Sequence, residues 1–277
     1  MRLGAPVFKA GSDPQAWVRA HVDKGYRAAY APPVDPHDRD AVRDYAAAAE
    51  KADIVIAETG AWSNPLSPNA EERAAAIAKC KTMLDMAECL GARCCVNISG
   101  SHSEVWDGPH PDNLKRETFD MIVEVVREII DEVAPTRTYY TLELMPFLFP
   151  DSAQSYLNLI RAINRPRFGV HMDFCNMISS VALYEKNKLM IEEAIRLLGP
   201  RMCSVHVKDV LMKPGMTLHI DEVVCGRGVL DHRTMLREFK RLDTDLPIML
   251  EHLSTEAEYD EAAAHLRACA ALEKAEL

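Results

Sequence analysis

Short apolar segments alternate with longer amphipathic segments along the whole chain, and this alternation constrains the fold more than any other feature of the sequence. Several of the short segments are apolar at successive positions, which is typical of strands buried on both faces of a parallel sheet. The predicted strands are residues 2–8, 26–32, 53–58, 93–99, 139–145, 168–174, 202–210 and 247–252. The predicted helices are about residues 13–23, 37–51, 69–90, 112–133, 152–163, 185–198, 230–241 and 255–275.

The segment at residues 112–133 illustrates the helix signal. Its apolar residues recur at helical spacing, and acids and bases occupy the other face, as in a helix on the surface of a globular domain. Asp112 or Asn113 is expected to cap the start of this helix. Gly91 is expected to cap the end of the helix before it.

Eight strand–helix pairs in 277 residues predict an α/β fold, the (β/α)8 TIM barrel. Right-handed crossovers between successive strands build a parallel sheet, and eight such units close it into a barrel. An open, doubly wound sheet is the alternative, but no G-x-G-x-x-G follows the first predicted strand. No linker or change in composition divides the chain, so we expect a single domain over residues 1–277.

Net charge and hydropathy indicate which classes of binding partner are disfavoured. The formal net charge is −10, whereas binding to nucleic acid or to an anionic membrane needs a basic surface. No apolar run approaches the ~18 residues of a membrane-spanning helix, and the first residues do not resemble a signal peptide. We therefore expect a cytoplasmic protein with neither nucleic acid nor membrane as partner. The eight cysteines form no C-x-x-C pair, and most are expected to be reduced core residues.

One predicted strand carries a charge where a buried strand normally has an apolar residue. Glu143 lies in YYTLELM, and the next three predicted strands each contain a potential metal ligand near the end: Asp173, His206 and Glu251. Each alone is more often a surface carboxylate or a hydrogen-bonded core histidine. Their spacing, however, is about one strand–helix unit from each to the next. A barrel would therefore bring all four to the mouth where active sites form.

Three carboxylates at one mouth would repel one another unless a cation lay among them. Three carboxylates with one imidazole suit a hard or borderline divalent ion better than a thiolate-bound zinc ion. We therefore predict a divalent metal ion as cofactor, Mn²⁺ in the first place and Mg²⁺ or Co²⁺ as alternatives. The predicted metal ligands are Glu143, Asp173, His206 and Glu251.

Side chains two positions apart on a strand share a face, which predicts neighbours of the metal site. By this rule Asp173 brings a histidine with it, and His206 brings a lysine. The predicted substrate-binding residues are Glu58, Trp62, Asn97, His171, Asn176, Lys208 and Arg227. Several have a structural alternative: Trp62 covers the barrel edge, Lys208 pairs with Asp209 on the rim, or His171 supports a ligand.

The order of the segments LELMP, HMDFCN, VHVKD, CGRGVLD and IMLEHL resembles the xylose isomerase-like barrel superfamily of sugar isomerases and epimerases. The resemblance covers roughly residues 53–253. It implies a Glu, Asp, His, Glu metal quartet, which falls on Glu143, Asp173, His206 and Glu251. In the epimerase branch the two glutamates also transfer protons, which implies that Glu143 and Glu251 are the catalytic bases.

Several positions depart from the epimerase pattern. Asn176 stands where a histidine is expected three residues after the metal-binding aspartate, and Met212 stands where ketose 3-epimerases tend to have an arginine. The H-x-K-D run at residues 206–209 is more similar to the dehydratase branch. The resemblance therefore supports a class of chemistry rather than one named reaction.

We therefore expect a sugar isomerase or epimerase that removes a proton next to a carbonyl and passes through a metal-stabilised enediolate. The alternative is a lyase at the same site, either inosose dehydratase-like or acting on a keto-glycoside by β-elimination. A type IV endonuclease-like enzyme is disfavoured by the acidic charge, and a non-catalytic sugar-binding barrel by the cost of idle buried carboxylates. A homo-oligomer is expected, and Arg227 is the only candidate for contact with a substrate phosphate.

Overall fold

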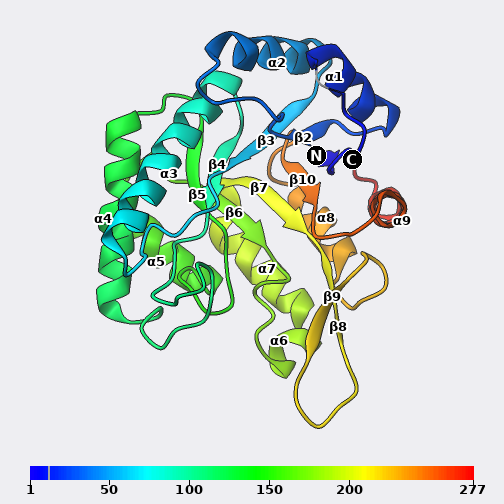
Figure 1. Ribbon diagram of the computed structural model, residues 1–277. Helices are drawn as coiled ribbons and strands as arrows, with labels where there is room; N and C mark the ends of the chain where they lie inside the picture. The colour runs from blue at the N-terminus through cyan, green and yellow to red at the C-terminus, as the bar shows by residue number, and fades with distance from the viewer. Residues whose placement is uncertain (12) are drawn as a thin grey trace.

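The computed structural model of the protein describes residues 1–11 and 13–277. Its main feature is a ring of parallel strands surrounded by helices (Figure 1). The strands of the ring are β1 (Arg2–Gly4), β2 (Ala28–Tyr30), β3 (Val55–Gly60), β4 (Cys94–Asn97), β5 (Tyr139–Leu142), β6 (Val170–Asp173), β7 (Met202–Val207) and β10 (Pro247–Leu250). The helices are α1 (Pro14–Asp23), α2 (Arg39–Lys51), α3 (Ala70–Leu90), α4 (Arg116–Val133), α5 (Ala153–Ile163), α6 (Val181–Glu185), α7 (Asn187–Leu198), α8 (His232–Phe239) and α9 (Glu256–Leu272), with a short 3₁₀ helix at Gly199–Arg201.

The strands follow the order β5-β4-β3-β2-β1-β10-β7-β6, and the neighbouring pairs are parallel. Two further parallel bridges, Tyr140 with Phe168 and Glu143 with His171, bring the two ends of this sheet together. The predicted TIM barrel is therefore confirmed. In this fold the carboxyl ends of the strands form the mouth at which active sites lie.

Each predicted strand and helix overlaps at least one element of the structure, and the helix ends show how local sequence sets the boundaries. The Asn69 side chain accepts two backbone N–H groups at the start of α3. Gly91 ends that helix with φ of +71°, as predicted. The predicted cap of α4 is wrong, because that helix begins after Lys115. The Asn113 side chain instead accepts a backbone N–H of the loop after β4, and Asp112 pairs with Lys115.

A hairpin that the sequence did not predict projects from the mouth of the barrel (Figure 1). Its antiparallel strands are β8 (Asp209–Met212) and β9 (Ile220–Val223). The predicted strand at residues 202–210 is therefore divided at Lys208, between β7 and β8. This division places the hairpin directly after the strand that carries His206.

The Asp209 carboxylate accepts backbone hydrogen bonds from the segment that follows this hairpin. Its Oδ1 accepts the backbone N–H groups of Val210 and Leu230, at 2.9 and 3.0 Å. Its Oδ2 accepts those of Gly226 and Gly228, at 2.9 and 3.0 Å. A Cβ at Gly228 would lie 2.3 Å from Asp209 Oδ1, and Gly226 has φ of +94°. Glycine is therefore required at both positions, which accounts for the sequence CGRGVLD.

The described residues also bear on two simpler expectations. Each of the eight cysteines, all of them within the described part of the chain, has a free thiol, and all but Cys89 are buried. This agrees with the prediction of reduced core cysteines. Among residues 1–11 and 13–277, no helix combines the length and the apolar character that crossing a membrane requires.

Candidate metal centre

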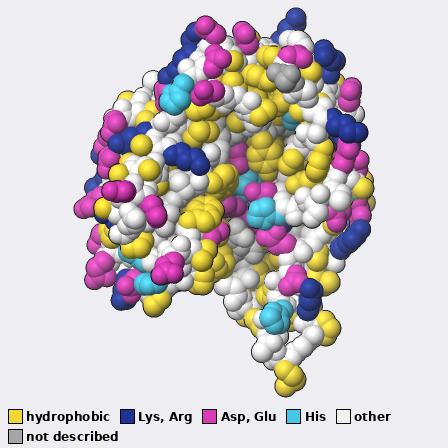
Figure 2. Space-filling model, viewed as in Figure 1, with side chains coloured by type: hydrophobic (Ala, Val, Ile, Leu, Met, Phe, Trp, Pro, Cys, Tyr) yellow, Lys and Arg dark blue, Asp and Glu magenta, His cyan; other side chains and the backbone are white. Residues whose placement is uncertain are grey.

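The four predicted metal ligands lie together at the mouth of the barrel. Asp173 ends β6, His206 lies in β7, and Glu143 and Glu251 directly follow β5 and β10. One potential ligand atom from each residue lies within 4.8 Å of those from the other three. The four strands are neighbours in the ring. Acidic and histidine side chains are visible inside the central hollow of the molecule (Figure 2).

The His206 imidazole lies at the centre of this cluster. Its Nδ1 lies 3.0 Å from Glu143 Oε1 and 3.1 Å from Glu251 Oε2. Its Nε2 lies 2.8 Å from Glu58 Oε1, on the other side of the ring. Burial alone would lower the pKa of His206, but the surrounding carboxylates raise it well above its usual value. The imidazole is thus held between carboxylates on both of its nitrogens.

The Asp173 carboxylate uses one oxygen for the fold and presents the other to the cluster. Its Oδ1 accepts the backbone N–H groups of Cys175 and Asn176, at 2.8 and 3.2 Å. Its Oδ2 is buried and lies 2.8 Å from the ammonium nitrogen of Lys208. The same nitrogen lies 2.7 Å from Glu251 Oε2. The turn after β6 therefore orients the oxygen that faces the other ligands.

The alternative interpretation of Lys208, a pair with Asp209 on the rim, is wrong. The Lys208 side chain is buried at the mouth against Asp173 and Glu251, whereas Asp209 is occupied by backbone N–H groups. Burial would lower the pKa of Lys208, but these two carboxylates raise it far above its usual value. The lysine is therefore a fixed positive charge inside the site.

The donor set fits a divalent cation. Glu251 Oε2 and Asp173 Oδ2 are buried, and both lie next to the same ammonium group, that of Lys208. Burial raises the pKa of Glu143 against the opposing effect of His206, so its charged form is poorly compensated. Asp173 and Glu251 share the single ammonium group of Lys208. Because crowded buried carboxylates are costly, and because oxygen donors with one imidazole suit Mg²⁺ or Mn²⁺, these residues form a candidate site for such an ion.

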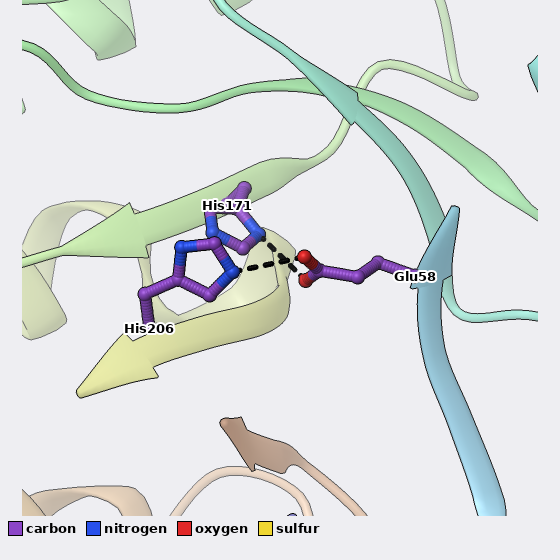
Figure 3. A group of neighbouring side chains, drawn as sticks. All are labelled: Glu58, His171 and His206. Atoms are coloured by element: carbon purple, nitrogen blue, oxygen red, sulfur yellow. Dashed lines mark hydrogen bonds and ion pairs between the residues drawn. The ribbon is translucent and has the colours of Figure 1, made fainter. Parts of the chain in front are cut away.

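A second group of potential ligands shares His206 (Figure 3). It consists of Glu58 from β3, His171 from β6 and His206. The Glu58 carboxylate is 2% exposed, and its Oε2 lies 3.3 Å from His171 Nδ1. The His171 and His206 rings meet edge to face, with centroids 4.1 Å apart. Burial and the neighbouring His206 lower the pKa of His171 to about 4, so this ring is neutral near pH 7.

Two aromatic side chains flank the cluster. The ring centroid of Trp62, on the loop after β3, lies 6.5 Å from that of His206, and that of Tyr30 lies 6.1 Å away. Both rings line a cavity of about 320 Å³ together with Glu58 and Glu251. Trp62 therefore lies where it can form an apolar wall of a substrate pocket, as well as covering the barrel edge.

The predicted place of Asn97 is wrong. The register pairs Asn97 with Leu142 and the preceding Val96 with Thr141, so Asn97 shares a face with Leu142 and not with Glu143. Its Oδ1 accepts the Ser63 backbone N–H at 3.0 Å, on the outer side of the sheet. Asn97 therefore holds the loop that carries Trp62 and does not face the mouth.

Asn176 and Arg227 lie at the margins of the site. The backbone of Asn176 binds Asp173, and its amide nitrogen lies 3.6 Å from the sulfur of Met145. The Arg227 guanidinium forms two hydrogen bonds with Glu261 at 2.7 and 2.6 Å. Arg227 also lines a cavity of about 250 Å³ that includes Lys208. Among the described residues, the partners of these two side chains do not include any of the four predicted metal ligands.

Sequence reasoning missed three residues near the ligands. Glu222, on the unpredicted hairpin, lies 2.9 Å from His252 Nδ1 and 3.7 Å from Lys208 Nζ. His252 follows Glu251 and has φ of +59°. Glu222 was missed because the hairpin itself was not predicted, whereas His252 ends the predicted strand 247–252 and lies next to Glu251 in the sequence. Tyr30 ends β2, and the rule that strand ends line the mouth was enough to find it.

Solved structures resemble this one over nearly its whole length. The probable 3-DHS dehydratase AsbF involved in petrobactin synthesis, from Bacillus anthracis, matches with a TM-score of 0.71 at 15% identity, over 96% of this chain and 97% of that chain. D-psicose 3-epimerase with D-tagatose, from Clostridium cellulolyticum H10, matches with a TM-score of 0.69 at 16% identity, over 99% and 98%. A xylose isomerase-like TIM barrel protein in complex with magnesium, from Mycobacterium smegmatis, matches with a TM-score of 0.66 at 12% identity, over 96% and 90%. At such identities the likeness shows the fold.

Sequence comparison assigns the family. No curated protein matches the chain. The family described as xylose isomerase-like TIM barrel matches residues 18–269, a range that includes all four predicted metal ligands. The resemblance read from LELMP, HMDFCN and VHVKD is thereby confirmed, and the chain belongs to the xylose isomerase-like TIM barrel family.

Proposed function

We propose that the protein is a divalent-metal-dependent sugar isomerase or epimerase that transfers a proton at the carbon next to a carbonyl. One observation carries the proposal: Glu143 and Glu251 both face the same nitrogen of His206, at 3.0 and 3.1 Å, and Asp173 belongs to the same cluster of potential ligands. These atoms are buried at the mouth of a barrel. The D-psicose 3-epimerase structure among its structural relatives supports the same class of chemistry.

The quartet Glu143, Asp173, His206 and Glu251 would hold the ion. When bound, the ion would supply Lewis acidity that stabilises negative charge on the substrate's carbonyl oxygen. Mn²⁺ is our first choice, and the magnesium complex of one structural relative keeps Mg²⁺ as an alternative. Lys208 provides a further fixed positive charge next to Asp173 and Glu251.

The two glutamates would move the proton. They follow β5 and β10, which are separated in the ring by β6 and β7, so a sugar bound between them presents a different face to each. One carboxylate removes the proton next to the carbonyl, and the other returns a proton to the opposite face or to the neighbouring carbon. The first outcome is epimerisation and the second is isomerisation.

The remaining predicted residues would hold the sugar. Lys208 and His171 can donate hydrogen bonds to hydroxyl groups, and Trp62 can pack against the apolar face of the ring. Asn176 lies at the margin, close enough to contact a longer substrate. Arg227 would reach a substrate only after leaving Glu261.

Elimination is the second candidate, and Lys208 is the observation that favours it. After proton removal, a hydroxyl or glycosyl oxygen on the β-carbon can leave as water or alcohol if a proton reaches it. The buried ammonium of Lys208, 2.7 Å from Glu251 Oε2, is placed to hydrogen-bond the departing oxygen and to stabilise its developing negative charge, while the carboxylate that removed the first proton returns it to that oxygen. The product would be an unsaturated keto compound.

The test separates these outcomes. The Mn²⁺-loaded protein is incubated in D₂O with ketoses, aldoses, 3-keto-glycosides and their phosphorylated forms, with a chelated sample as control. We expect deuterium at the carbon next to the carbonyl in a recovered or converted sugar, and none after chelation. Elimination would instead give a product absorbing in the near ultraviolet. Turnover without any solvent-derived deuterium, or full turnover after chelation, would overturn the proposal.

A further inference from the structure

The Glu58 side chain extends from β3 toward the rings of His171 and His206 (Figure 3). It comes from β3, which is separated from β7 in the ring by β2, β1 and β10. Its Oε1 lies 2.8 Å from His206 Nε2, and its Oε2 accepts the Ser204 hydroxyl at 2.8 Å. Both carboxylate oxygens therefore already have protein partners, which argues against the predicted role of Glu58 in binding substrate.

We infer that Glu58 is a positioning residue for the metal centre: its carboxylate holds the Nε2–H of His206, so that the Nδ1 lone pair faces Glu143, Asp173 and Glu251. This inference rests on the metal site of the proposed function. It assigns Glu58 a role in metal binding through His206 and no contact with the ion.

The chemistry of imidazole gives the first reason. A neutral imidazole has one N–H donor and one acceptor nitrogen. An ionised carboxylate only accepts hydrogen bonds, so without an ion both nitrogens of His206 are donors, Nε2 to Glu58 and Nδ1 to Glu143 and Glu251, which lie 3.0 and 3.1 Å away. An ion bound at Nδ1 would take the place of the hydrogen there, and the hydrogen that faces Glu58 would stay on Nε2. A carboxylate behind a metal-binding histidine also fixes the orientation of the ring and makes it a stronger ligand.

The surroundings of Glu58 give the second reason. A carboxylate with 2% exposure is costly to bury unless its oxygens are hydrogen bonded. Ser204, two residues before His206 on β7, and the His206 ring supply those hydrogen bonds. One strand thus carries both the ligand and the hydroxyl that holds the orienting carboxylate. This coupling ties the position of Glu58 to that of His206.

The same three residues, Glu58, His171 and His206, also have the spacing of a second metal site. Filling both sites would require His206 to bind one ion through each nitrogen and to lose its last hydrogen. A hydrogen bond from Nε2–H to Glu58 excludes that arrangement. The inference therefore predicts one ion per chain.

The experiment measures Mn²⁺ binding, which needs no substrate. Free Mn²⁺ is followed by electron paramagnetic resonance during titration of the wild-type chain, Glu58→Gln, Glu58→Leu and Thr59→Val. Gln keeps an acceptor without the charge, whereas Leu removes the acceptor. Thr59 is the matched control, because it is the next buried residue on β3 but its hydroxyl bonds to the Met83 carbonyl on the other side of the strand.

We expect the wild type to bind one Mn²⁺ per chain and Glu58→Leu to bind it about 10–100-fold more weakly. Glu58→Gln should lie between them, and Thr59→Val should match the wild type even if its melting temperature falls. Wild-type affinity in both Glu58 variants, or two ions per chain, would overturn the inference alone. Failure of the wild type to bind Mn²⁺ would remove the proposed metal function as well.

A second measurement guards against variants that fail to fold. Nitrogen-15 spectra of the Mg²⁺-loaded wild type report which nitrogen of His206 carries the hydrogen, with His206→Asn used only to assign the signal. We expect hydrogen on Nε2 and none on Nδ1. Hydrogen on Nδ1, or on neither nitrogen, would overturn the inference without any change at Glu58.

Discussion

The two ends of the barrel both concentrate charged side chains, but they compensate the charge differently. At the mouth, Glu143, Asp173 and Glu251 crowd around one imidazole, and two of them share the single ammonium group of Lys208. The opposite end has a concavity of about 1040 Å³. Its charged lining residues are Arg93, Arg137, Arg201, Arg241 and Asp243.

Charges near the opposite end have local partners. Arg93 pairs with Asp243, and Arg137 donates to the carbonyl oxygens of Glu88 and Cys89 at the end of α3. The Glu88 carboxylate accepts hydrogen bonds from the Thr136 hydroxyl and from backbone N–H groups of the segment before β5. Although its partial burial acts in the other direction, these hydrogen bonds lower the pKa of Glu88 to about 2.

This comparison distinguishes charged side chains that stabilise the fold from charged side chains that are placed to bind a ligand. In TIM barrels the end opposite the mouth contributes mainly stability, and the mouth carries the chemistry. Here the hydrogen bonds of Glu88 favour its charged form in the folded chain, whereas burial disfavours the charged form of Glu143. Substitutions at the two ends should therefore have opposite signatures.

The largest effect is expected from Glu143→Gln at the mouth. Loss of one proton-transferring carboxylate should slow solvent-deuterium exchange into a substrate by about 10²–10⁴-fold. The metal-free protein should keep or gain stability near pH 7, because the raised pKa of Glu143 means that its charged form is destabilised by folding. Exchange rates and urea denaturation measure the two effects. A less stable protein with unchanged exchange would show that Glu143 is structural.

The second prediction concerns metal addition. Mn²⁺ at about 100 times its dissociation constant should raise the free energy of unfolding by about 2.7 kcal/mol, because the ion relieves repulsion at the mouth. Thermal unfolding with and without Mn²⁺ measures this. Asp173→Asn, which removes a ligand charge, should lose most of the gain. An equal gain in that variant would place the ion elsewhere.

The third prediction concerns acid stability and Glu88. Its folded-state pKa is about 2, against an ordinary value of 4.5 for a glutamate. The depressed pKa stabilises the fold fully above about pH 4.5, and this contribution is lost as the pH falls from 4.5 toward 2. After allowance for solvent screening it amounts to about 1–2 kcal/mol. Urea denaturation of Glu88→Gln should show a weaker pH dependence in this window and unchanged Mn²⁺ binding.

The smallest effect is expected from Asp243→Asn, which removes the partner of Arg93. The two side chains are 34% and 39% exposed. Ion pairs at such exposure contribute about 0–1 kcal/mol to the free energy of unfolding. Stability should change by no more than that, and Mn²⁺ affinity should not change. A loss of Mn²⁺ affinity would show that the two ends are coupled and would break the comparison.

The metal quartet was predictable because two strong signals coincide in it. The strands around Glu143, Asp173, His206 and Glu251 are clear apolar runs, and the barrel places their carboxyl ends at one mouth. A charged residue in such a run is conspicuous. The geometry of the four side chains then follows from the fold, and no long-range information is needed to choose them.

Asn97 shows where sequence reasoning ends. The strand CCVNIS has apolar residues on both faces, since Cys95 and Val96 are both buried, so its periodicity does not reveal which side chains point inward. Only the pairing of Asn97 with Leu142 in the register decides this. The contact of Glu58 with His206 was equally out of reach, because it joins strands that are not neighbours in the ring.

The four backbone hydrogen bonds of Asp209 have a practical consequence for redesign. They join the start of β8 to the segment that follows β9, while the tip of the hairpin extends into solvent with a fully exposed Met216. We therefore expect that residues 213–219 can be exchanged without displacing His206 or its neighbours. Libraries at these positions would test whether the hairpin tip affects substrate choice while the candidate metal ligands stay unchanged.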